Sequence, residues 1–148
     1  MSDEPADLAD LADLVLTVAR EIQLRGFGDT GALALTATEG NVMRYIDRHP
    51  GSTPRVVAAA TGVQPSNLSA TLRSLEEKGL IERVVDATDG RSARLRPLPF
   101  AAENLERVRA SWVAFLGPVL EGVDAEAIRS TIELLELVEA GIVTARLA

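Results

Sequence analysis

The 148-residue sequence contains no cysteine, a single histidine and a single lysine, and aromatic residues make up only 3% of it. Without cysteine it can form neither disulfides nor thiolate metal sites. His49 stands alone, with no nearby cluster of carboxylates, so we expect no metal site. There is no glycine-rich phosphate loop and no Ser/His/Asp spacing. The residues therefore favour a protein that is not an enzyme and needs no cofactor.

Long hydrophobic runs are also missing. The longest apolar stretches are a few residues, whereas a membrane-spanning helix needs about 20. The N-terminal stretch MSDEPADLADLADL is acidic where a signal peptide would be basic. We therefore expect a cytoplasmic protein without a membrane partner. Its hydrophobic fraction of 47% is enough to bury the core of one domain.

Positive charge is scarce overall but is concentrated in the middle of the chain. The net charge is −7, yet residues 52–96 carry seven basic and five acidic groups, a net of +2, and the remainder carries −9. A polyanion can therefore meet a basic centre while the acidic ends face elsewhere.

The spacing of apolar residues and the helix-terminating residues predict six helices and a hairpin. Helices are expected over 5–25, 38–48, 54–61, from Gln64 or Ser66 to Lys78, 100–120 and 125–145, and strands over 81–85 and 92–98. We expect Pro97 and Pro99 to end the second strand, and Gly117-Pro118 to kink or fray the helix that contains them. Short helices joined by a tight turn and followed by a hairpin describe a winged helix-turn-helix. The fold class is thus mainly α with a small β-hairpin wing.

The long outer helices carry more apolar residues than a monomer with so small a centre would cover, which favours dimerisation. We therefore expect an N-terminal dimerisation helix and loop over 1–35, a winged helix-turn-helix over 36–99 and C-terminal dimerisation helices over 100–148. Together they would form one intertwined domain.

Residues 75–83 (LEEKGLIER), followed by Asp89-Gly90-Arg91, resemble the signature of MarR-type bacterial transcription regulators. The resemblance implies a homodimer bound to a pseudo-palindromic operator in double-stranded DNA, near its own or adjacent genes. It also implies a small aromatic or lipophilic effector that relieves repression. The chain departs from the family at Pro97-Leu98-Pro99, and at Ala70 and Ser74, where the recognition helix often carries basic residues.

The helix after Gln64 is the expected recognition helix. Leu68, Leu72 and Leu75 share one face and should pack inward. The candidates for contact with DNA are Gln64, Ser66, Asn67, Ser69 and Arg73. Asparagine can pair with adenine, and arginine can bind guanine or a phosphate. An ordinary solvated polar face would have the same composition.

The hairpin tip and the first helix of the motif supply further candidates. Arg91 can enter the minor groove, while Arg94 can hold a phosphate or brace the turn. Asp89 would orient Arg91, although a surface Asp–Arg pair of little energetic weight is the alternative. Thr53 and Arg55 can bind the DNA backbone at a helix N-terminus, and Thr53 is equally suited to cap that helix.

Tyr45, Trp112 and Phe115 are candidates for an effector pocket, with packing in the core or the dimer as the commoner role of such residues. Two functions stay open. The first is a dimeric operator-binding repressor. The second is a winged-helix module or co-regulator that binds protein without direct operator binding, favoured by the low basic charge of the recognition helix.

Overall fold

The computed structural model describes residues 4–25, 30–85, 87, 88 and 90–148. Its elements in chain order are α1 (Glu4–Leu24), α2 (Ala37–Arg48), α3 (Pro54–Thr61), α4 (Pro65–Glu77), β1 (Ile81–Val85), β2 (Ala93–Pro97), α5 (Pro99–Val119) and α6 (Ala125–Leu147). Each agrees with the sequence prediction to within a few residues at its ends. The predicted fold class, mainly helical with one hairpin, is confirmed.

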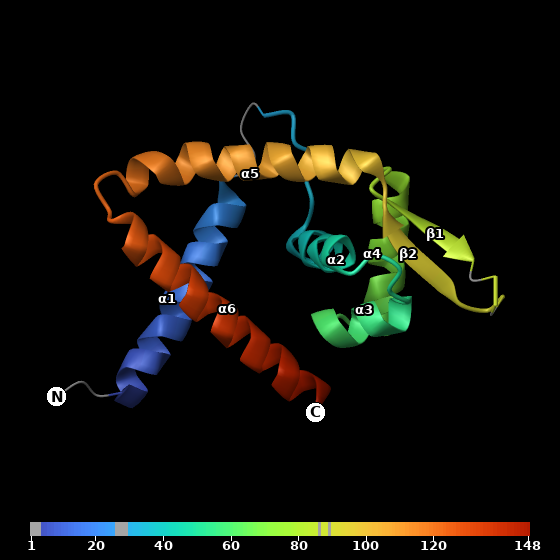
Figure 1. Ribbon diagram of the computed structural model, residues 1–148, viewed down its shortest axis with the longest axis horizontal. Coiled ribbons are helices and arrows are strands. Elements are labelled where there is room, and N and C mark those ends of the chain that lie inside the picture. The colour runs from blue at the N-terminus through green and yellow to red at the C-terminus, as the bar shows by residue number, and fades with distance from the viewer. Residues whose placement is uncertain (1–3, 26–29, 86, 89) are drawn as a thin grey trace.

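α5 forms the long axis of the molecule (Figure 1). The helices α2, α3 and α4 and the hairpin gather around its N-terminal end, while α1 and α6 extend from its other half. The C-terminal end of α6 returns to α3, where the Arg146 guanidinium donates a hydrogen bond of 2.8 Å to the Ala60 carbonyl. The winged helix-turn-helix therefore occupies one end of the structure.

Local sequence signals set the ends of the short helices. Thr36 and Glu39 form a capping box at the start of α2, and Thr53 followed by Pro54 starts α3. Gly62 and Gly79 then follow α3 and α4 with φ of 71° and 73°, a left-handed conformation that glycine adopts without a steric penalty. These ends match the sequence prediction because each depends only on residues within one helical turn.

The hairpin pairs β1 with β2 in antiparallel register, from Ile81 opposite Pro97 to Val85 opposite Ala93. The centre of β2 also joins the turn between α2 and α3, since the Gly51 N–H donates to the Leu95 carbonyl and the Leu95 N–H donates to the Ser52 carbonyl. The wing is therefore fastened to the helical motif as well as to its own partner strand.

The prolines lie where the two elements end. β2 ends at Pro97, its last paired residue, as the sequence predicted. Pro118 lies inside α5, and the helix ends one residue later, at Val119. A proline near the end of a helix leaves only one carbonyl without its usual partner, which explains why the helix tolerates it.

The buried core belongs almost entirely to the winged region. Its largest fully buried side chains are Ile46, Leu72, Leu75, Leu80, Ile81, Leu95, Val42 and Val57. Neither α1 nor α6, both described in full, contains a buried residue. Large apolar side chains stay exposed on these two helices, namely Leu8, Leu14, Val15, Leu16, Val18, Leu24, Ile132, Leu134, Leu135, Leu137, Val138, Ile142 and Leu147.

Candidate nucleic-acid interface and adjoining cavity

The exposed face of α4 carries the side chains expected to meet DNA. Leu68, Leu72 and Leu75 are at most 2% exposed and fix the inward face of the helix. The five candidates are all exposed, and they are Gln64, Ser66, Asn67, Ser69 and Arg73. α4 follows α3 after a three-residue turn, which is the position of the second helix in a helix-turn-helix.

Hydroxyl groups on α4 already bond to their own helix. Ser69 Oγ donates to the Pro65 carbonyl at 3.1 Å, and Thr71 Oγ1 donates to the Asn67 carbonyl at 2.9 Å. In this rotamer Ser69 can accept a hydrogen bond but has no proton left to give to a phosphate. The stronger donors on the exposed face are therefore the Asn67 amide and the Arg73 guanidinium.

Ser74 was expected on the exposed face of α4, and this expectation is wrong. The side chain is partly buried, and its Oγ donates a 2.6 Å hydrogen bond to Oε1 of Glu39 at the start of α2. A basic side chain at position 74 would point into the protein and not toward DNA. The absence of charge there consequently says nothing about the strength of DNA binding, whereas Ala70 does lie exposed.

Glu39 is a buried carboxylate, 6% exposed, that sequence reasoning missed. Its Oε2 accepts hydrogen bonds from Lys78 Nζ at 2.7 Å and from the Thr36 N–H at 2.9 Å. Burial raises the pKa of the Glu39 carboxyl, but the bonds from Lys78, Ser74 and Thr36 outweigh it and leave the pKa below its ordinary value. The carboxylate therefore stays charged and ties α2 to the C-terminal half of α4. The spacing of Thr36 and Glu39, which is that of a capping box, is the feature of the sequence that could have drawn attention to Glu39.

The wing places Arg91 and Arg94 on the exposed side of the hairpin. Arg94 Nη1 donates to the Gly51 carbonyl at 3.3 Å, so in this conformation the side chain braces the hairpin against the α2–α3 turn. Arg83 on β1 pairs with Glu76 of α4 at 2.9 Å, which links the wing to the recognition helix. Asp89, expected to orient Arg91, lies outside the described residues.

The N-terminus of α3 lies beside the wing, because Ser52, the residue before Thr53, pairs with Leu95 of β2. Thr53 Oγ1 accepts a hydrogen bond of 3.4 Å from the Val56 N–H and so caps the helix. Arg55, one residue into the helix, is exposed. A capped helix start with an exposed arginine beside it offers both partial and full positive charge to a phosphate.

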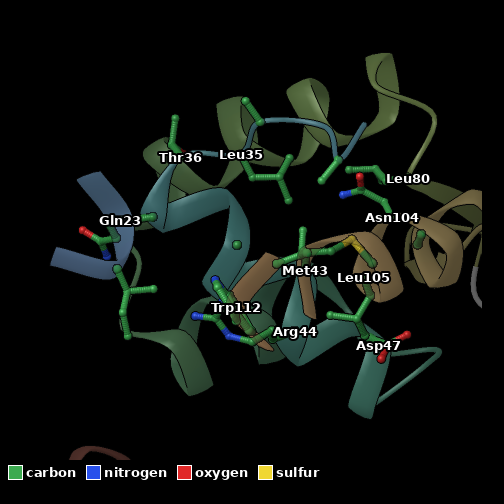
Figure 2. Close-up of a pocket in the computed structure, with 17 residues that line it drawn as sticks. Gln23, Leu35, Thr36, Met43, Arg44, Asp47, Leu80, Asn104, Leu105 and Trp112 are labelled. Atoms are coloured by element: carbon green, nitrogen blue, oxygen red, sulfur yellow. The ribbon is translucent and has the colours of Figure 1, made fainter. Parts of the chain in front are cut away.

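A cavity of about 650 Å³ adjoins the winged region and is lined by α1, α2, α5 and the segment before α2 (Figure 2). Apolar side chains dominate its wall, including Leu35, Met43, Leu105 and Trp112. Polar groups are few: among them are Asn104, whose Oδ1 accepts a 2.6 Å hydrogen bond from the Leu33 N–H, and Arg44. An apolar chamber with a few polar groups suits a small organic molecule.

The three aromatic candidates do not meet in this cavity. Trp112 lines it, but Tyr45 faces a second cavity of about 510 Å³ between α2, α3 and α6, where its ring lies 4.5 Å from that of His49. Phe115 lies under the Arg25 guanidinium, 4.4 Å from ring centre to cation. Sequence reasoning missed Asn104, although a polar residue four positions before the buried Val108 signals an inward-facing amide.

In the described part of the chain no helix is long and apolar enough to span a membrane. Among the same residues, no three histidine or carboxylate side chains come together in a way that would hold a metal ion.

Architecture and surface together define a winged helix-turn-helix protein with long helical extensions. Solved structures share this fold over nearly the whole chain. A MarR-family transcriptional regulator from Rhodococcus sp. RHA1 aligns with a TM-score of 0.70 at 21% identity, covering 94% of this chain and 96% of its own. The regulator PcaV from Streptomyces coelicolor, solved with its natural ligand, aligns with a TM-score of 0.63 at 19% identity, covering 93% and 95%. FabT from Streptococcus pneumoniae, solved in complex with DNA, aligns with a TM-score of 0.61 at 24% identity, covering 93% and 94%.

The sequence model of the MarR family matches residues 35–92, the segment from the start of α2 into the wing. Through this segment the chain is similar to the MarR family, and over nearly its whole length it shares the fold of solved MarR-family regulators.

Proposed function

We propose that this protein is a homodimeric regulator that binds a pseudo-palindromic operator in double-stranded DNA and represses its own or adjacent genes. The observation that carries the proposal is the exposed polar face of α4, opposite its buried leucines, within a winged helix-turn-helix. The solved complex of FabT with DNA supports the same use of the fold here.

In this proposal Asn67 and Arg73 make the direct contacts in the major groove, with Gln64, Ser66 and Ser69 around them. Arg91 enters the minor groove, Asp89 orients it, and Arg94 steadies the wing. Thr53 and Arg55 bind the DNA backbone at the start of α3. These basic groups all lie within residues 52–96, which carry a net charge of +2 while the rest of the chain carries −9.

Dimerisation is supported by the exposed apolar side chains of α1 and α6. Side chains such as Leu16 and Leu137 are each 71% exposed, and burying a leucine is worth roughly 1.5–3 kcal/mol. A second copy of the chain would cover them and would place two recognition helices on one duplex. The three predicted parts of the chain, 1–35, 36–99 and 100–148, would then form one intertwined domain.

The effector is proposed to be a small aromatic or lipophilic molecule that enters the cavity beside Trp112. Its mainly apolar wall favours such a ligand, and PcaV is a protein of this fold solved with its natural ligand. Tyr45 and Phe115, which face elsewhere, are better suited to packing than to contact with this ligand.

A binding assay with the DNA upstream of the gene tests the proposal. Purified protein should bind that duplex at low salt as a dimer, and affinity should fall steeply as salt rises. No binding to upstream DNA at any salt concentration would refute it. The alternative is a protein-interaction module, which is favoured by the low basic charge of α4, with its single basic residue. Binding to a protein partner in the absence of any duplex binding would support that alternative.

A further inference from the structure

The turn of chain that opens α2 has two faces with different neighbours. Toward one side, Leu35, Thr36, Ala37 and Gly40 line the 650 Å³ cavity. Toward the other, Glu39 is buried against α4. Side chains one residue apart on a helix differ in direction by about 100°, so one short turn separates the cavity from the recognition helix.

Direct hydrogen bonds join this turn to α4. Glu39 Oε1 accepts from Ser74 Oγ at 2.6 Å, and Glu39 Oε2 accepts from Lys78 Nζ at 2.7 Å. Lys78 Nζ also donates to the carbonyl of Ala34 at 3.4 Å, in the segment that forms the cavity wall. The Glu39–Lys78 pair is mostly shielded from water, with 9% and 29% of the two side chains exposed. Charged hydrogen bonds in such a setting are short and strongly directional.

We propose that Glu39 is the positioning residue through which occupation of the cavity changes the placement of the recognition helix. A molecule that fills the cavity presses on residues 34–37 and on Gly40. Glu39 moves with that turn, and its bonds to Ser74 and Lys78 must then either pull α4 along or break. This coupling rests on the proposed function for its biological use, and it is reciprocal: DNA that fixes α4 must alter ligand affinity by the same factor.

A side chain built into the cavity can replace the unidentified ligand. Gly40 lies in α2 and lines the cavity, and the nearest atom to an added Cβ is the flexible end of Arg44 at 3.4 Å. Gly40→Phe would therefore partly fill the cavity with little backbone strain. Amide hydrogen exchange across residues 70–78 then reports on α4 without any DNA.

The test is a cycle of Gly40→Phe, Glu39→Gln and the double variant. Gly40→Phe should raise exchange in the C-terminal half of α4 by about tenfold, as expected when a local unit loses part of its support. Glu39→Gln should also raise the exchange rate in this half of α4. The rate in the double variant should be less than about twofold higher than in Glu39→Gln alone. A Gly40→Phe effect of equal size with and without Glu39, or no effect on α4 at all, overturns the proposal. A residue with only a structural role would give additive effects.

Matched variants exclude the simpler explanations. Glu77→Gln removes an exposed carboxylate from the same helix and should leave both basal exchange and the Gly40→Phe effect unchanged. Lys78→Arg keeps a cation opposite Glu39 and should preserve the coupling, whereas Lys78→Met should remove it. Where Gly40→Phe fails to fold, Ala37→Leu fills the same cavity from a more exposed position and is judged by the same criteria. Since no DNA is used, failure of operator binding refutes the proposed function and leaves this result standing.

Discussion

Arg73→Ala should weaken operator binding and flatten its salt dependence while leaving the fold intact. Arg73 is exposed and is the single basic residue of α4. Alanine is at least as good a helix former as arginine, so the helix itself loses nothing. Loss of DNA affinity in this variant would therefore report on the interface and not on stability.

The expected size follows from the geometry of a dimer. Two copies of Arg73 face one duplex, and each phosphate contact contributes about 0.9 to the slope of log K against log salt concentration. If both copies hold phosphates, the magnitude of the slope should fall by about 1.8, and the loss of DNA affinity should be similar on every sequence. If Arg73 instead pairs with guanine, the loss should be about 1–3 kcal/mol per contact and confined to duplexes carrying that base.

Fluorescence anisotropy with a labelled duplex at four salt concentrations measures both quantities. Arg129→Ala is the matched control, because Arg129 is an exposed arginine on α6 whose 2.6 Å partner is Glu126 of the same helix. Its affinity and slope should equal those of the wild type. Equal values for Arg73→Ala and Arg129→Ala on all sequences would refute the assignment of α4 as the DNA-contacting helix.

Three further outcomes follow from burial and charge. Leu75→Ala empties a fully buried position and should lower the free energy of unfolding by about 2–5 kcal/mol in urea titrations, and a loss below about 1 kcal/mol would contradict its place in the core. The pKa of Glu39 in the folded protein lies below its ordinary value of 4.5. The Glu39 carboxylate therefore contributes fully to the free energy of unfolding above pH 4.5, and this contribution is lost as the pH falls through the folded-state pKa. Glu39→Gln should therefore flatten the acid limb of a stability–pH curve, and an unchanged limb would show that the carboxylate is not what titrates. Leu137→Glu, at a 71% exposed apolar position of α6, should shift the protein toward monomer in sedimentation, and an intact dimer would remove this face from the interface.

Local chemistry allowed the sequence to predict most of the winged helix-turn-helix. Three local features predicted it: the capping Thr53-Pro54, the glycine after α4 and the leucine spacing of α4. Each acts within one or two helical turns, so its effect can be predicted from a short segment of the sequence. The same reasoning identified an apolar surplus in the outer helices, which the exposed side chains of α1 and α6 confirm.

Tertiary structure alone decided which side chains meet across the fold. Ser74 and Lys78 are separated from Glu39 by 35 and 39 residues, and their shared hydrogen bonds depend on how α2 packs against α4. The same packing turns Ser74 inward, directs Trp112 into one cavity and Tyr45 into another, and joins Arg94 to the turn at Gly51. Periodicity gives the buried face of each helix, but the partner of that face is set by contacts among distant segments, which periodicity does not encode.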